Sequence, residues 1–162
     1  GIRDYKVTGV QTCALPILWE RTLQGHAMAT KIALNRFVAL GGEQFFPTPD
    51  NTYLMCWYRF GEDQRMYVRG RLPKARYFSF TLYNAWMESL DYTRRPVHRN
   101  ATNIQTDADG NFELVLSNDD PGVPNWLDTC GHSAGYLLAR ALLAEEELPL
   151  PTIEVRYHRE VK

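Results

Sequence analysis

The segment QRMYVRGR, residues Gln64–Arg71, alternates between two kinds of side chain. Met66, Val68 and Gly70 fall on one side, and arginine and tyrosine side chains fall on the other. Successive side chains of a β-strand point to opposite faces of its sheet, so this period of two predicts a half-buried strand. We therefore expect a sheet with one face in a core and the other face in solvent.

The segments on either side carry the same period. We expect strands over Tyr53–Arg59 and Tyr77–Asn84, which are rich in the aromatic residues that suit a half-buried surface. The linkers at residues 61–63 and 72–74 are short. This predicts that the three strands form one antiparallel meander.

The C-terminal half predicts further strands. Asn103–Thr106 and Phe112–Ser117 flank the sequence DADG, whose Asp-Gly pair predicts a hairpin. Thr152–His158 alternates and is expected to be a closing strand, whereas Ala134–Leu143 fits a strand or a helix by pattern alone. The stretch 86–101 predicts no regular element, although it carries three arginines and a histidine between positions 94 and 99.

A helical period precedes the first of these strands. Within Leu18–Leu40, apolar side chains recur at helical spacing, and two glycines then provide a stop. The recurring residues are Leu23, Ala27, Leu34, Phe37 and Val38. The sequence therefore predicts a mainly β fold, an antiparallel β-sandwich or jelly-roll-like domain with an N-terminal α-helix.

Residues 1–17, GIRDYKVTGVQTCALPI, resemble the in-frame translation of a common sequencing adapter. Gly1–Asp4 and Val7–Ile17 match its outer and inner parts, and Tyr5 and Lys6 fall where a sample index would lie. Such a segment is excluded from fold reasoning. We therefore expect one domain over residues 18–162, taken from the C-terminal part of a longer bacterial-type protein whose gene continues upstream.

Composition excludes several classes of protein. With 18 basic and 19 acidic residues the chain lacks the basic excess of a nucleic-acid binder. No apolar run approaches the roughly 20 residues that span a bilayer, so no membrane partner is expected. Cys56 and Cys130 form no C-x-x-C pair, and we expect two free thiols. The four histidines show no metal-ligand spacing, so we expect no metal and no cofactor, and the compartment stays unknown.

The sequence GHSAG, residues 131–135, fits the G-x-S-x-G pattern of a nucleophile elbow. In this interpretation Ser133 would be the nucleophile of a serine hydrolase. The candidate acid and base, Glu154 and His158, fall on one predicted strand, and no buried strand leads into the serine. A coincidental match is therefore favoured, with the hydrolase kept as an alternative.

Arg140 lies in an otherwise apolar run. A buried guanidinium needs a partner, because an unpaired buried charge is costly. The partner could be a carboxylate such as Asp128, or the arginine could hold a bound anion with its planar fork. Arg69 and Arg71, which share a strand face with Tyr67, are further candidates for an anion-binding role.

Several patches together resemble the family catalogued as domain of unknown function 1214, which often follows domain of unknown function 1254. The patches are PDNTY at 49–53, YVRGR at 67–71, YFSF at 77–80, DGNFE at 109–113, and NWLDT at 125–129 with Gly131, His132 and Arg140. The resemblance implies a β-rich sandwich, a strand rather than a helix over Tyr136–Leu143, and an upstream partner domain. It requires no serine at position 133 and implies no established reaction.

The polar residues of these patches form the candidate site. They are Asp50, Asn51, Tyr53, Arg69, Arg71, Asn125, Trp126, Asp128, His132 and Arg140. We expect arginine clamps, an aromatic wall and a carboxylate–histidine pair that bind a small anionic or polar ligand. The alternatives are the serine hydrolase and a purely structural module that docks a partner domain through an exposed apolar patch.

Overall fold

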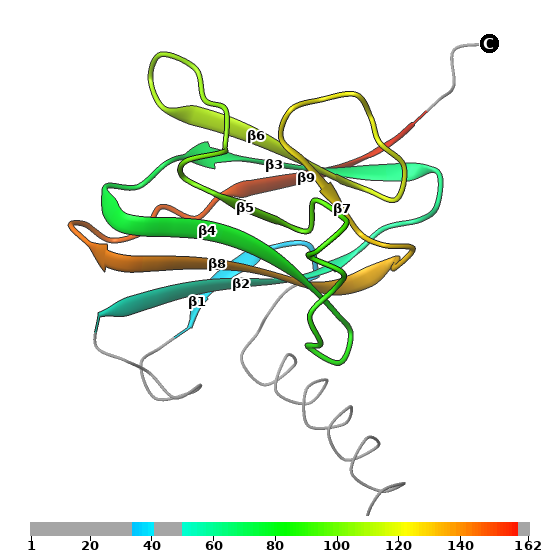
Figure 1. Cartoon of the computed structure of the whole chain (residues 1–162), viewed down its shortest axis with the longest axis horizontal. Helices are drawn as coiled ribbons and strands as arrows, with labels where there is room; N and C mark the ends of the chain where they lie inside the picture. The colour runs from blue at the N-terminus through cyan, green and yellow to red at the C-terminus, as the bar shows by residue number, and fades with distance from the viewer. Residues whose placement is uncertain (1–33, 41–49, 159–162) are drawn as a thin grey trace, which may run out of the picture.

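The structure, a computed structural model, describes residues 34–40 and 50–158. These residues form two β-sheets stacked in two layers (Figure 1). The strands are β1 (Phe37–Leu40), β2 (Asn51–Arg59), β3 (Gln64–Arg71), β4 (Ala75–Asn84), β5 (His98–Asn100), β6 (Asn111–Ser117), β7 (Trp126–Asp128), β8 (Ala134–Ala144) and β9 (Thr152–Tyr157).

One sheet has five strands in the order β1-β2-β8-β4-β5, and the other has four in the order β7-β6-β3-β9. All neighbouring strands are antiparallel except β6 and β7, which are parallel. The long strand β8 lies at the centre of the larger sheet, where Arg140 pairs with Tyr53 of β2 on one side and Ser79 of β4 on the other.

The inner faces of the two sheets share one apolar core. Phe80 of β4 and Met66 of β3 are completely buried, and the ring of Phe80 meets that of Phe112 across the layers, with centroids 5.4 Å apart. Edge-to-face ring contacts of this kind add about 1 kcal/mol to the burial itself. The alternation predicted for β3 and β4 is the pattern that supplies these inward side chains.

A second, smaller apolar group lies on the outer face of the five-stranded sheet, and we call it the outer cluster. Its buried members are Met55 and Tyr136, each 2% exposed, and Trp57 packs edge-on against Tyr136 with ring centroids 4.6 Å apart. The partly buried members are Val38, Leu40, Trp57, Tyr83, Met87 and Leu138.

The expectation of a mainly β fold is confirmed. Predicted strands coincide with β2, β3, β4, β6, β8 and β9 within a few residues, and the uncertain segment Ala134–Leu143 is a strand. No helix long and apolar enough to cross a membrane occurs among the described residues. The jelly-roll connectivity stays a prediction.

The predicted meander is wrong. Strands β2 and β4 both lie beside β8, and β3 belongs to the other sheet, so none of the three pairs with another. The short linkers carry the chain from one sheet to the other rather than back along the same sheet. Linker length alone does not distinguish these two paths.

The predicted hairpin at residues 103–117 is also wrong, because only its second arm is a strand. The turn closes on itself instead. Asp107 accepts hydrogen bonds through Oδ1 from the backbone N–H groups of Asp109 and Asn111, and through Oδ2 from Nδ2 of Asn111 at 2.9 Å. Aspartate favours this kind of local turn.

The predicted helix over Leu18–Leu40 is wrong at its end. Phe37–Leu40 is strand β1, in which Phe37 pairs with Cys56 of β2. Phe37 is buried in the core while Val38 joins the outer cluster, so this pair satisfies an alternating pattern as well as a helical one. The rest of the predicted helix up to residue 33, and the adapter-like residues 1–17, lie outside the described residues.

Candidate ligand-binding site

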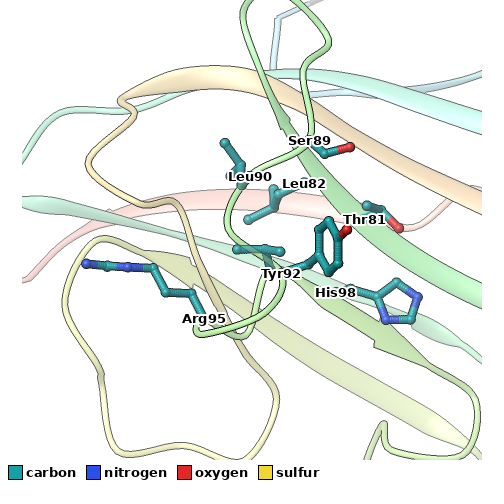
Figure 2. Close-up of a pocket in the computed structure, with 8 residues that line it drawn as sticks. Thr81, Leu82, Ser89, Leu90, Tyr92, Arg95 and His98 are labelled. Carbon is teal, nitrogen blue, oxygen red and sulfur yellow. The ribbon is translucent and has the colours of Figure 1, made fainter.

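A cavity of about 320 Å³ opens beside strands β4 and β5, under the segment that connects them (Figure 2). Thr81 and Leu82 come from β4, His98 begins β5, and the other lining residues belong to the connection. The lining residues are Thr81, Leu82, Ser89, Leu90, Tyr92, Arg95, Val97 and His98.

Polar side chains fold the connecting segment over this cavity. Asn84 accepts hydrogen bonds through Oδ1 from the backbone N–H groups of Trp86 and Glu88, at 2.9 and 3.0 Å. Further along, the hydroxyl of Thr93 donates a hydrogen bond to Oδ1 of Asp91, with the two oxygens 2.6 Å apart. Such aspartate and asparagine turns set the path of an irregular segment without a regular ladder.

The cavity has an apolar floor and a polar rim. Leu82, Leu90 and Val97 are buried and form the floor. Tyr92 is 71% exposed and stands beside His98 at the mouth, as Figure 2 shows. Because the backbone N–H of Leu82 donates to the carbonyl of Val97 at 2.9 Å, the two sides of the floor are held together.

His98 is a hydrogen-bonding group at the rim whose surroundings favour the neutral imidazole. Its Nε2 lies 3.2 Å from the hydroxyl of Tyr77. Partial burial, and to a smaller extent the charge of Arg99, lower the pKa of His98 below its usual value. A neutral imidazole offers one donor and one acceptor, and because Tyr77 takes up Nε2, Nδ1 is the nitrogen that remains for a polar ligand.

Arg95 brings a positive charge that is already paired. Its NH1 lies 2.8 Å from Oδ2 of Asp128, whose side chain is only 4% exposed. The other carboxylate oxygen of Asp128 accepts the backbone N–H of Cys130 at 2.7 Å. In Figure 2 the Arg95 side chain extends away from Tyr92 and His98. The cavity therefore presents hydrogen-bonding groups rather than an unbalanced charge.

The ten residues proposed from the sequence lie in separate places. Three of them, Asn125, Trp126 and Asp128, attach the short strand β7 to its surroundings. Nδ2 of Asn125 donates to the carbonyls of Gln105 and Glu113, and Nε1 of Trp126 donates to a backbone carbonyl at 3.2 Å.

Arg69 and Arg71 lie on the outer face of the four-stranded sheet. Arg69 binds two carboxylates, Glu113 at 2.6 Å and Glu154 at 2.9 Å. Arg156 also binds Glu154, and its guanidinium lies 4.9 Å from the ring centroid of Tyr67. Hydrogen bonds from Arg156 and then Arg69 lower the pKa of Glu154 to about 2. The charge of Arg69 is thus taken up within the sheet.

The structure brings Asn51, Tyr53 and Arg140 together on the outer face of the five-stranded sheet, and Asp50 lies in the turn just before β2. The expected burial of Arg140 and its pairing with Asp128 are wrong. Arg140 is exposed because the alternation of β8 turns it outward, and its Nε donates to Oδ1 of Asn51 at 2.7 Å.

His132 and Ser133 are exposed in the turn between β7 and β8. Strand β8 follows Ser133, whereas a nucleophile elbow requires a helix at that point. The acid considered for the triad, Glu154, is occupied by two arginines. The geometry therefore gives no support to a catalytic Ser133. Among the described residues, no group of three or more histidine, cysteine or acidic side chains is placed to hold a metal ion.

Sequence reasoning missed the residues that line the cavity. Their only signal was the cluster of arginines and His98 in a stretch without regular structure. The cavity forms because the connection folds back on β4, and this long-range contact leaves no periodic pattern.

Comparisons with known proteins identify the fold and no activity. No family model and no curated protein sequence matches this chain. The structure resembles that of an uncharacterised protein from Burkholderia cenocepacia, with a TM-score of 0.74, 24% identity, and coverage of 84% of this chain and 39% of that one. It also resembles the VPA0106 protein from Vibrio parahaemolyticus, with a TM-score of 0.57, 20% identity, and coverage of 71% and 33%.

The chain therefore spans about two fifths of one similar protein and a third of the other. At these identities the likeness concerns the fold alone. The resemblance to the family catalogued as domain of unknown function 1214 stays a prediction.

Proposed function

We propose that this chain is a β-sandwich domain that binds a small polar molecule in the cavity between β4, β5 and their connection. The observation that supports this function is the combination of an apolar floor with a rim of hydrogen-bonding side chains in a cavity of about 320 Å³. Small-molecule sites in proteins combine an apolar lining with a few placed polar groups at volumes upward of roughly 300 Å³.

The electrostatics favour an uncharged polar ligand in this cavity over an anion. Asp128 offsets the charge of Arg95, and the lowered pKa of His98 favours its neutral form. A ligand with a flat hydrocarbon body would contact the floor and stack on Tyr92, and its polar end would bond to Thr81 or His98. Benzamide and benzoate form a matched pair of probes, because they have similar shapes and differ in charge.

The test is a nuclear magnetic resonance titration of the 162-residue chain with each probe. We expect benzamide to shift the backbone signals of the lining residues to saturation, and benzoate to bind more weakly. His98→Phe should weaken benzamide binding, while the control His132→Phe, at an exposed turn, should leave it unchanged. Equal binding by both variants, or no saturable shift with either probe, would refute the proposal.

A second candidate function is a module that docks another domain of a longer polypeptide. The outer cluster favours it, as does the small share of the two similar proteins that this chain covers. The test is hydrogen exchange at Met55 and Trp57, compared between this chain and a version extended upstream in its native gene. Slower exchange in the extended protein would support docking, and equal rates would argue against it.

A further inference from the structure

Arg140 is the central member of a polar row on the outer face of the five-stranded sheet. It pairs in register with Tyr53 on one side and Ser79 on the other, and Ser79 pairs in turn with Asn100 of β5. Residues directly opposite one another in an antiparallel pair project on the same face. Four neighbouring strands thus contribute one polar side chain each to this row.

The guanidinium of Arg140 is oriented without being neutralised. Its Nε donates to Oδ1 of Asn51 at 2.7 Å, and an amide oxygen carries no net charge. Among the described residues no carboxylate lies within 4.0 Å of it, whereas Arg69 and Arg95 each bind one. The two terminal nitrogens of the fork make no hydrogen bond to the described residues, and such a pair can bind an oxyanion through two parallel hydrogen bonds.

Tyr53 lies directly opposite Arg140 in register, whereas Tyr83 lies further along the same face, opposite Tyr136. Burial raises the pKa of Tyr83, and the nearby Tyr53 adds to the rise while the charge of Arg140 opposes it. The three groups are therefore within electrostatic reach of one another. Phenol hydroxyls are donors as well as acceptors, so they complement an anion held by the arginine.

We propose that Arg140, oriented by Asn51 and paired in register with Tyr53, forms a binding site for a small oxyanion such as a carboxylate or a phosphate. Leu138, two residues along β8, belongs to the adjoining outer cluster and offers apolar contact to the organic part of such a ligand. The site is distinct from the cavity because the two share no residue: the Arg140 row ends at Ser79 and Asn100, and the cavity begins two residues along β4 and β5, at Thr81 and His98.

The experiment titrates the 162-residue chain with inorganic phosphate and, separately, with acetate. Ionic strength is held constant with sodium chloride, since general screening of surface charges must not change. The readout is the backbone amide shifts of Tyr53 and Ser79. We expect saturable shifts with at least one probe. The probe that binds more tightly shows whether the site prefers a phosphate or a carboxylate.

Two variants test the assignment to Arg140. Arg140→Gln should weaken binding about tenfold or more, because a charge-assisted pair of hydrogen bonds is lost. Asn51→Asp keeps the shape but places a carboxylate against the guanidinium, so it should abolish binding through an internal ion pair. The matched control Arg59→Gln, an exposed arginine at the far end of β2, should bind as the unchanged chain does.

Equal binding by the unchanged chain and Arg140→Gln would overturn the proposal, as would shifts that rise linearly without saturation, which indicate an adventitious ion only. A variant counts only if its amide spectrum keeps the dispersion of the folded protein. Benzamide binding in the cavity should survive Arg140→Gln, so failure here and failure of the proposed cavity function are separately visible.

Discussion

Gly135 gives the sharpest test of the packing between β4 and β8. A Cβ at this position would lie 2.2 Å from the carbonyl oxygen of Tyr83 and 2.7 Å from the hydroxyl of Tyr58. Both distances are shorter than any real contact of a Cβ atom, and the nearer atom belongs to the backbone of β4. Alanine therefore cannot be accommodated by a side-chain rotation, and the two central strands must separate.

The expected cost of Gly135→Ala is about 3 kcal/mol of the free energy of unfolding, at the upper end of overpacking in a rigid core. Two other glycines scale the effect. At Gly70 the nearest atom is a ring carbon of Phe112 at 2.9 Å, so we expect about 1–2 kcal/mol. At Gly61 it is the flexible end of Gln64 at 3.4 Å, so the change should stay within about 0.5 kcal/mol.

Urea unfolding followed by tryptophan fluorescence measures all three variants. The order Gly135, Gly70, Gly61 is the prediction, and equal values for Gly135→Ala and Gly61→Ala would refute the reasoning. A double variant adds a finer test. The hydroxyl of Tyr58 is buried and has no hydrogen-bond partner among the described residues, so Tyr58→Phe alone should be close to neutral. When Tyr58→Phe is added to Gly135→Ala, it should restore only part of the lost free energy of unfolding, because the clash with the backbone of β4 remains.

Three further predictions concern charge and burial. Glu154 should titrate with a pKa near 2, below its usual 4.5, so its ion pairs stabilise the fold above pH 4.5 and are lost as the pH falls through about 2. In a carboxyl-group titration by nuclear magnetic resonance, Arg156→Gln should raise the pKa of Glu154. An unchanged pKa would contradict the contact between the two side chains. Asp128→Ala removes the partner of Arg95 and an acceptor for a backbone N–H, so it should lower the free energy of unfolding in urea by about 2 kcal/mol. A loss below about 0.5 kcal/mol would show that the pair is not formed. Burial raises the pKa of Cys56 to about 12, so iodoacetamide at pH 8 should leave this thiol unmodified in the folded protein and label it in urea. Peptide mass spectrometry measures the labelling. Labelling without urea would place the thiol outside the core.

Local patterns predicted the strands well because side chains alternate between the two faces of a strand, and burial alternates with them. The alternation in Gln64–Arg71 matches β3 residue for residue, and the inward side chains of Tyr77–Asn84 are those that fill the core. Pairing was beyond the reach of these patterns, since it depends on which sheet each linker enters. The same limit applies to Phe37 and Val38, whose spacing fits both a helix and a strand.

The glycines of GHSAG show how a structural need can imitate a catalytic motif. Gly131 has a φ of +83°, a conformation that favours glycine, and it follows Cys130, which is itself left-handed. Gly135 is required by the close approach of Tyr83 and Tyr58. Each glycine thus has a reason in the turn or the strand that follows it, and neither reason involves the serine between them.

The residues of the polar patches fall into two groups. Some use their hydrogen-bonding groups to hold the backbone, and others keep groups that can bind a ligand. Strand β7 has three residues, too few to be held by its own ladder. Asn125 and Trp126 complete its attachment through bonds to backbone carbonyls, which leaves these groups little capacity for a ligand. Arg140 differs because its one bond fixes the direction of the guanidinium and leaves its charge unbalanced among the described residues. By this criterion, of the ten residues proposed from the sequence, the pair Arg140 and Asn51 is the one to test first for binding.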